Sequence, residues 1–422
     1  MTGQRFPLAN NDIIRIDPTG ADLHAEAAAL RARGPATRVE LPGQIIAWLV
    51  TEPALLRRLA ANPLLSKNPH AHWPDYLSGR VSADWMQRWF ETDIMVTADG
   101  ADHARMRGVV SDAFTPRRIA RLRQAVEGIV HRLLDQVGAA PVGTTVDLHA
   151  SFSHALPMLV IAELFGLPES LHDSFRRKVD DLFCANDDND DESVVDALAA
   201  HKTLYALLAD LVTLKRARPG NDLTTDLIAA YEPTGAFGSP PRELINNLML
   251  FIAAGHRTTV HLLSSAMVNL LTNPDQLDLI RSGAARWEDA IEETLRQRAP
   301  ISNLLIWYPV EDVHDEESGL TFRQNEPVVM GLLAASCDPQ VHGPDADQFD
   351  ITRPTRAQHL AFGHGPHYCL GAPLARLEAQ VALPALFARF PALELATPKE
   401  LLPQEAIFMF CGFDGLPVRL TP

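Results

Sequence analysis

The sequence predicts a mainly α-helical fold with a minor β part, formed by one domain over residues 1–422 around a single long core helix. Three observations lead to this prediction. Apolar residues follow helical periodicity over most of residues 102–214, a long helix-like segment covers 239–272, and a few short apolar runs between turns resemble strands. No repeat or linker-like segment divides the chain, and 46% hydrophobic residues suffice for a large core.

The first half of the chain begins with mixed signals and then becomes helical. Residues 45–51 form a compact apolar strand candidate after the turn at residues 41–43. A helical pattern runs from 102 to 137, with a break at Thr115-Pro116 where proline suits the first turn of a second helix. Helical periodicity continues to residue 214. The acidic run at 186–192 lacks the glycine and the spacing of an EF-hand and therefore predicts a solvated loop.

The second half contains the longest predicted helix. It begins at Ser239-Pro240, ends at Thr272 before Asn273-Pro274, and would be about 50 Å long at 1.5 Å per residue. Its centre is apolar on every side, so it should cross the core. A helix at 287–298, strand-like runs at 304–308 and 327–330, and an irregular stretch at 337–359 follow. The last helix begins near Gly371, and a short β-like tail ends the chain.

Charge and composition exclude several classes of protein. The net charge of −16 argues against nucleic-acid binding, because phosphates would be repelled over most of the surface. The best apolar run has eight residues, which predicts no membrane span. Four cysteines lie far apart without CxxC pairing, and residues 1–11 show no export signal. A cytoplasmic protein is expected.

The most distinctive segment is 361–371, AFGHGPHYCLG. Its glycines at 363, 365 and 371 allow positive φ values and a close backbone approach to a flat partner. Cys369 directly precedes a predicted helix start, where partial positive charge and amide donors stabilise a thiolate, a suitable axial ligand for haem iron. A buried structural cysteine is one alternative. The other is a zinc site with closely spaced ligands from this region: His359, His364, His367 and Cys369.

The pattern from Phe362 to Gly371 resembles the haem-ligand signature of the cytochrome P-450 family, and further marks of that family follow its order. Glu293-Thr294-Leu295-Arg296 resembles its ExxR pair and lies 73 residues (369 − 296) before Cys369, with Arg353 between them. The resemblance implies that Glu293, Arg296 and Arg353 form a buried ionic cluster that supports the haem and takes no part in catalysis.

The resemblance also implies the contacts of the cofactor, haem b (iron protoporphyrin IX). Cys369 would be the metal ligand, and Phe362, Gly363 and Gly371 would complete its loop. His103 and Arg107, one helical turn apart, together with His367, would bind the propionates. An isolated HxxxR is more often an exposed helix face. The family usually has a propionate-binding arginine where Trp307 stands, so this chain departs from the pattern there.

Residues 254–259, AGHRTT, lie midway along the long helix and resemble the family's oxygen-binding turn. Gly255 would leave space over the iron, and Thr258 would offer its hydroxyl to dioxygen. Thr259 and His256 are further catalytic candidates. The family usually has Asp or Glu where Arg257 stands. Arg257 therefore either reaches solvent, pairs with an internal carboxylate or meets an anionic substrate, and the sequence leaves these three open.

The resemblance covers nearly the whole chain. Within the family, the chain is similar to actinobacterial members that hydroxylate steroids and macrolides. It implies a haem-thiolate monooxygenase that inserts one oxygen atom from O2 into a small apolar substrate. Electrons would come from a separate ferredoxin and ferredoxin reductase, because the haem domain takes up the whole length. One alternative is a peroxide-driven peroxygenase acting on a carboxylate substrate. Another is a non-catalytic haem protein that binds or senses ligands. Thr258 weighs against both.

Two surfaces follow from this reading. Family topology implies a pocket lined by residues 70–88, 159–183, 250–258, 301–306 and 407–410. Between residues 103 and 123 a single acid, Asp112, accompanies six arginines: Arg105, Arg107, Arg117, Arg118, Arg121 and Arg123. Either Arg107 binds the haem and the other arginines are simply solvated, or the exposed members form a docking surface for an acidic ferredoxin.

Overall fold

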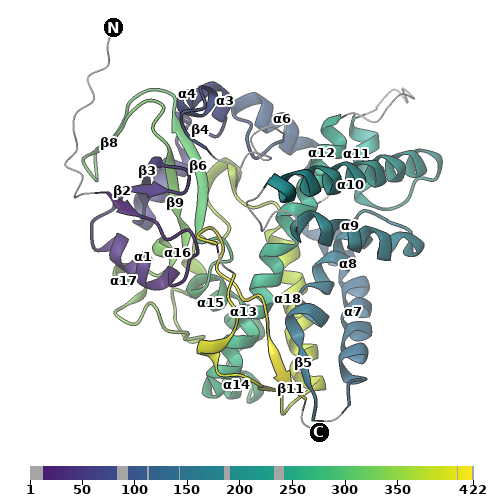
Figure 1. Ribbon diagram of the computed structural model, residues 1–422. Helices are drawn as coiled ribbons and strands as arrows, with labels where there is room; N and C mark the ends of the chain where they lie inside the picture. Colours follow the sequence, from purple (N-terminus) through teal and green to yellow (C-terminus); the bar gives the residue numbers. More distant parts are fainter. Residues whose placement is uncertain are drawn as a thin grey trace.

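The computed structural model describes residues 13–82, 94–111, 114–141, 143–184, 191–231, 242–405 and 407–420 (Figure 1). Helices dominate, and the longer ones gather on one side of the molecule, while the strands of the main sheet lie on the other. The predicted mainly α-helical architecture with a minor β part is confirmed. Within these ranges no helix is both long and apolar enough to cross a membrane.

The main sheet has six strands in the order β1-β2-β3-β9-β6-β4. Its strands are β1 (Ile14–Arg15), β2 (Ala36–Leu41), β3 (Ile45–Val50), β9 (Val328–Gly331), β6 (Asn303–Pro309) and β4 (Leu65–Ser66). β3 confirms the strand expected after the turn at 41–43. It forms an antiparallel hairpin with β2, which the sequence did not predict, and pairs in parallel with β9. Two smaller sheets contain β10 (Glu394–Leu395), β11 (Pro417–Arg419) and β5 (Thr145–Asp147), and β7 (Val313–Asp315) with β8 (Leu320–Phe322).

Helices occur where the sequence predicts them, and short helices that it did not predict accompany them, among them Pro339–His342 inside the stretch expected to be irregular. The helices are α1 (Leu23–Arg31), α2 (Pro53–Ala61), α3 (Pro69–His72), α4 (Pro74–Leu77), α6 (Gly100–Ser111), α7 (Pro116–Gly138), α8 (Ala155–Leu164), α9 (His172–Cys184), α10 (Asp191–Ala217), α11 (Leu223–Tyr231), α12 (Arg242–Gly255), α13 (Arg257–Thr272), α14 (Pro274–Arg281), α15 (Trp287–Gln297), α16 (Leu332–Ser336), α17 (Pro339–His342) and α18 (Ala372–Arg389).

One region is less helical than predicted. β5 and a π-helical turn at His149–Ser153 interrupt the continuous helicity expected up to residue 214. β5 pairs with β11 at the end of the chain, so a long-range strand pairing overrides the local preference. The break at Thr115-Pro116 is confirmed, with Pro116 in the first turn of α7. Of the acidic run at 186–192, residues 186–190 lie outside the described residues.

The long core helix is two helices in line. α12 and α13 are separated at His256, whose ψ is −74°. The hydroxyl of Thr258 donates to the carbonyl oxygen of Ala254 at 2.8 Å, and such a bond to the fourth preceding residue often bends a helix. The predicted start at Ser239-Pro240 lies outside the described residues, and the end at Thr272 is confirmed.

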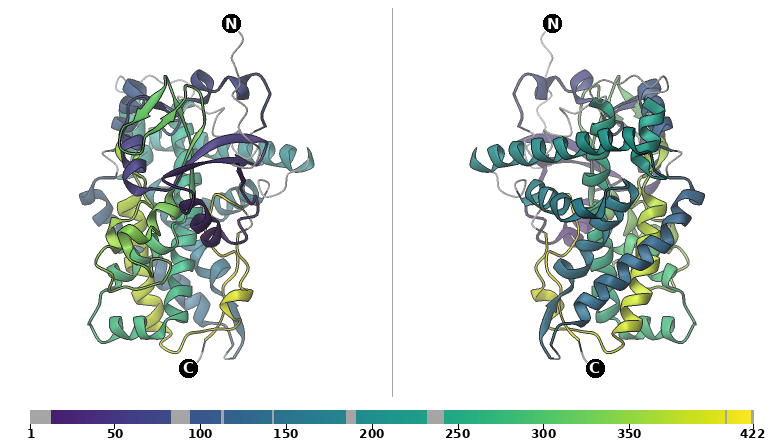
Figure 2. Two further views of the ribbon diagram at one scale, coloured as in Figure 1. Left: turned by 90° about the vertical axis from the view of Figure 1, so that its left-hand side faces the viewer. Right: turned by 90° about the vertical axis from the view of Figure 1, so that its right-hand side faces the viewer.

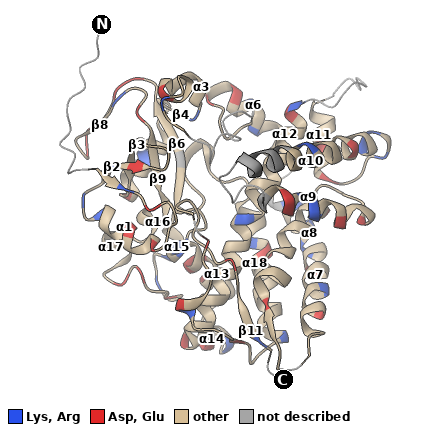
Figure 3. Ribbon diagram, viewed as in Figure 1, with Lys and Arg blue, Asp and Glu red and all other residues tan. Residues whose placement is uncertain are grey.

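The core lies among α7, α8, α12, α13 and α18. α7 packs against α18, and α13 packs against both α15 and α18 (Figure 2, right). Most residues of α13 are buried, as is His256 at the helix break. Charged residues of both signs lie along α7, α9 and α10 at the outside (Figure 3).

Candidate active site

The loop that carries Cys369 is held by its own backbone. The amide of Cys369 donates to the carbonyl oxygen of Phe362 at 2.9 Å, and that of Tyr368 donates to Gly365 at 3.0 Å. Gly365 has φ +72°, and a Cβ there would lie 2.5 Å from a backbone oxygen of α2, so only glycine fits. The positive φ expected at Gly371 is wrong: its φ is −79°, because it is the N-cap of α18.

The Cys369 residue is exposed, although protein atoms crowd around its thiol. Burial raises its pKa, while backbone amides of Gly371 and Ala372 and the charges of Arg107 and Arg376 act in the opposite direction. These amides belong to the start of α18, as expected from the sequence. The surroundings therefore supply partners for a thiolate, although burial alone favours the neutral thiol.

α6 brings His103 and Arg107 to this loop. The rings of His103 and His367 lie 4.1 Å apart, and Arg107 donates from Nη2 to the carbonyl oxygen of Tyr368 at 2.7 Å. His103 Nε2 is buried and has no hydrogen-bond partner among the described residues. Burial and then the charge of Lys67 lower the pKa of His367 to about 2. The structure thus gathers the three predicted anion-binding residues and adds Lys67, which no sequence pattern indicated.

The ExxR pair is buried as predicted. Glu293 and Arg296 are fully buried, and the guanidinium meets the carboxylate through two hydrogen bonds of 2.8 Å each. Arg353 Nε lies 3.3 Å from the same carboxylate. Arg296 also donates to the carbonyl oxygens of Ser336 and Ala346 at 3.0 and 2.6 Å. This arrangement ties α15 to the irregular segment that precedes the cysteine loop.

A second ion pair, which sequence reasoning missed, supports the loop from α18. Arg376 contacts Glu292 through hydrogen bonds of 2.6 and 2.8 Å, and its guanidinium lies 4.5 Å from the ring centre of the half-buried Phe362. His359 contacts the same carboxylate at 3.1 Å. Because the described residues contain no group of three or more His, Cys, Asp or Glu side chains able to hold a metal ion, the zinc alternative has no geometric support.

At the helix break, the predicted catalytic residues occupy different environments. Thr258 is half-buried and Thr259 is buried. His256 is buried, and its Nε2 lies 3.0 Å from the carbonyl oxygen of His154, while burial lowers its pKa to about 3. His256 is therefore neutral near pH 7. A Cβ added at Gly255 would make an ordinary 3.5 Å contact with Ile161.

Arg257 pairs with an internal carboxylate, one of the three possibilities left open by the sequence. Its Nη2 lies 2.5 Å from Oε1 of Glu405, whose side chain is 3% exposed. His261, one turn later on α13, contacts the other carboxylate oxygen. The guanidinium also lies 5.3 Å from the ring centre of Phe410. Glu405 comes from the C-terminal tail, and this separation in sequence hides the pairing from any local pattern.

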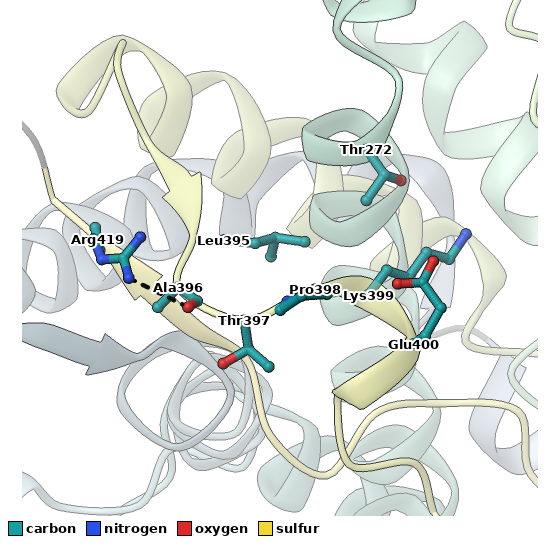
Figure 4. A pocket seen from close by; sticks show the side chains of 8 residues that line it. All are labelled: Thr272, Leu395, Ala396, Thr397, Pro398, Lys399, Glu400 and Arg419. Atoms are coloured by element: carbon teal, nitrogen blue, oxygen red, sulfur yellow. Dashed lines mark hydrogen bonds between the residues drawn. The ribbon is translucent and has the colours of Figure 1, made fainter.

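The surface has two hollows, one remote from the candidate site residues and one beside the cysteine loop. The hollow drawn in Figure 4 is lined by residues near β10 and β11, among them Thr272, Leu395, Lys399 and Arg419, and contains no predicted site residue. A smaller hollow of about 190 Å³ adjoins the cysteine loop at Phe362, Gly363 and Tyr368.

The residues around Cys369 fit a haem. A thiol at a helix start offers a soft axial ligand. Cationic or donor side chains on the adjacent α6 and on the loop suit two carboxylates, and the buried His103 Nε2 is a donor with no protein partner among the described residues.

Comparison with known proteins agrees with this fit. The cytochrome P-450 family model matches residues 287–410. The chain is 38% identical over 408 residues to 2-hydroxy-5-methyl-1-naphthoate 7-hydroxylase of Streptomyces carzinostaticus, covering 96% of this chain and 97% of that one. It is 35% identical over 408 residues to 6-deoxyerythronolide B hydroxylase of Saccharopolyspora erythraea, covering 96% and 97%.

A solved structure, CYP154A1 from Streptomyces coelicolor A3(2), is similar with a TM-score of 0.84 and 39% identity, covering 96% of this chain and all of that one. The similarity therefore extends over both the cysteine loop and the helix break. The chain belongs to the cytochrome P-450 family, and its function is that of a haem-thiolate monooxygenase.

Proposed function

We propose that Cys369 ligates haem b and that the protein hydroxylates a small apolar secondary metabolite. The observation that carries this proposal is the thiol at the start of α18, beside the cationic and donor groups of α6 and the loop. The relatives named above are hydroxylases of a naphthoate and of 6-deoxyerythronolide B, which supports substrates of the secondary-metabolite type. When bound, the haem supplies O2 activation, and a thiolate ligand favours O–O cleavage.

The chain's own residues would position the haem and control the delivery of protons. The Cys369 sulfur would accept hydrogen bonds from the backbone amides of Gly371 and Ala372. His103, Arg107 and His367 would bind the propionates. The shape of the loop would be maintained by Phe362, Gly363 and Gly371. At the helix break, the hydroxyl of Thr258 donates a hydrogen bond to the carbonyl oxygen of Ala254. Gly255, His256 and Thr259 complete this turn, with His256 as a neutral donor to a carbonyl oxygen.

We further propose that the whole chain, residues 1–422, is one domain acting in the cytoplasm with O2, a ferredoxin and a ferredoxin reductase. The family uses separate redox partners, and the resemblance to relatives covers nearly the full length. The substrate pocket would be lined by the five ranges expected from family topology, of which residues 83–88 lie outside the described residues. The ion pair of Arg257 with Glu405 weighs against the peroxygenase reading, in which this arginine would hold the carboxylate of the substrate.

The central test is the spectrum of the reduced protein with carbon monoxide. The wild type should show the red-shifted Soret band of thiolate ligation, and Cys369→Ala should lose it. Cys411→Ala, which removes a buried thiol outside this loop, is the control and should keep the band. A normal red-shifted band in Cys369→Ala contradicts the assignment.

Turnover identifies the electron source and substrate. Product should form with NADPH, ferredoxin and reductase, and much less with peroxide alone. Type I spectral shifts measured against steroids, macrolides, cyclic dipeptides and aromatic acids would then identify the substrate class.

A further inference from the structure

Lys67 is a buried lysine that follows β4 and faces the cationic cluster at the cysteine loop. β4 pairs with β6, with Ser66 opposite Tyr308, and this places the ammonium of Lys67 4.1 Å from the ring centre of Trp307. Only 5% of Lys67 is exposed. A buried ammonium is costly unless an anion or several acceptors compensate its charge.

The protein itself compensates this charge only in part. Asp99 is the carboxylate that acts on Lys67, but its oxygens already accept the Ser66 hydroxyl and the backbone amide of Lys67. Burial outweighs Asp99 and lowers the pKa of Lys67 to about 8. The contact with Trp307 adds a cation–π attraction, which compensates only part of the desolvation of an ammonium.

The other groups facing Lys67 are cationic or neutral donors. The backbone amide of Lys67 donates to the carboxylate of Asp99 at 2.9 Å, and the carbonyl oxygen of Asp99 accepts from the amide of His103 at 3.1 Å, so Lys67 lies beside the start of α6. The ring centre of His103 lies 4.1 Å from that of His367, and Arg107 donates to the carbonyl oxygen of Tyr368 in the same loop. The residue after β4, helix α6 and the cysteine loop thus bring one ammonium, one guanidinium and two imidazoles to one place. Such a cluster is suited to an anion with more than one carboxylate.

We propose that the ammonium of Lys67 binds a propionate carboxylate of the haem, together with His103, Arg107 and His367. This inference rests on the proposed function, because it requires that Cys369 holds haem in this site. Trp307 on β6 packs against the ammonium of Lys67 and so orients it. β6 has no cation where the family usually has an arginine, and the paired strand β4 supplies Lys67 in its place.

The test is haem retention, which does not depend on turnover. The rate of haem transfer from the ferric holoprotein to excess apomyoglobin would be measured for the wild type, Lys67→Met, Lys67→Gln and Lys67→Arg. Loss of one charge-assisted hydrogen bond should speed transfer about tenfold in Lys67→Met and Lys67→Gln. Lys67→Arg keeps the charge and should stay within about twofold of the wild type.

The matched control is Lys215→Met. Lys215 is also a mostly buried lysine, with its Nζ 2.6 Å from Asp222 on a distant part of the fold, so this variant should lose stability without faster haem transfer. The midpoint potential gives an independent signature. It should move to more negative values in Lys67→Met and Lys67→Gln, because a nearby positive charge favours the reduced iron.

Transfer at the wild-type rate in both Lys67→Met and Lys67→Gln would overturn the inference. It is equally overturned if Lys67→Arg loses haem as fast as Lys67→Met, because the role would then be packing and not charge. A wild type without the thiolate-type carbon monoxide spectrum would instead refute the proposed function.

Discussion

The cysteine-loop side and the helix-break side of the site are stabilised in different ways. On the cysteine-loop side, Glu293 and Arg296 belong to one helix and form an ion pair. Arg296 also donates hydrogen bonds to backbone carbonyl oxygens of later segments. On the helix-break side, Arg257 meets Glu405, which is 148 residues (405 − 257) later in the chain. The first arrangement joins side chains to backbone, and the second joins side chain to side chain.

This difference determines how freely each side can change. A guanidinium that satisfies several backbone carbonyl oxygens has no substitute, because any replacement leaves buried acceptors without donors. An ion pair between two side chains can be exchanged, removed or reversed together with its partner. The helix-break side is therefore the place where this chain can depart from the usual acid of the family without losing its fold.

The largest expected effect is on the cysteine-loop side. Glu293→Gln leaves the fully buried Arg296 guanidinium without its carboxylate, and breaking a buried pair in this way costs about 3–5 kcal/mol of unfolding free energy. Chemical denaturation would measure it. Asp278→Asn is the control, since Asp278 and Arg281 have the same spacing on an exposed helix face and should contribute less than about 1 kcal/mol. Equal losses in the two variants would show that burial of the Glu293–Arg296 pair adds nothing to its contribution.

The next effect should appear at Arg257. Arg257→Glu places two carboxylates together at the nearly buried Glu405 and should lower the unfolding free energy by about 2 kcal/mol, more than Arg257→Gln. In the cycle of Arg257→Gln, Glu405→Gln and the double variant, a coupling of about 1–3 kcal/mol is expected. Losses that simply add would show that the pair contributes nothing.

The sequence predicts the cysteine-loop side well and the helix-break side only in outline. The signature around Cys369 and the ExxR pair are local patterns, and His103 and Arg107 share one helix face, so their placement follows from short-range geometry. Glu405, Lys67 and Glu292 have no such pattern. Glu405 joins the site through a contact of the C-terminal tail, Lys67 through the pairing of β4 with β6, and Glu292 through its ion pair with Arg376 of α18. Such long-range contacts are invisible without the fold. The break at His256 also depends on a side-chain bond, from Thr258 to Ala254, that periodicity does not reveal.

A functional effect is expected at Thr258. Thr258→Ala should retain the haem spectrum but form less product per NADPH consumed, about half or less, with the remainder appearing as peroxide. Thr272→Ala is a closely matched control, because Thr272 makes the same bond to the fourth preceding carbonyl at 2.8 Å, at the far end of α13. Full coupling in Thr258→Ala would show that its hydroxyl takes no part in proton control.

The smallest effect concerns the arginine-rich segment between residues 103 and 123, which lies next to the cysteine-loop side. Arg107 on α6 binds the carbonyl oxygen of Tyr368 in that loop. Three of the other arginines face acids: Arg105 contacts Glu243, Arg118 contacts Asp226 and Arg123 lies near Glu127. These acids reduce the excess positive charge of the segment, and Arg117 and Arg121 remain as exposed charges on the first turns of α7.

Reversing these two charges tests whether the cysteine-loop side also receives the electron donor. Arg117→Glu with Arg121→Glu should slow ferredoxin-dependent turnover about two- to fivefold at low salt, and the difference should shrink at 0.5 M salt, where exposed charges are screened. The matched control is Arg177→Glu with Arg218→Glu, which changes the net charge by the same amount. Arg177 is an exposed residue of α9, and Arg218 is an exposed residue directly after α10. If both double variants slow turnover equally, net charge and not a docking surface on α7 explains the effect. Unchanged ferredoxin kinetics in the α7 variant at low ionic strength would exclude this surface, because complementary charge acts most strongly there.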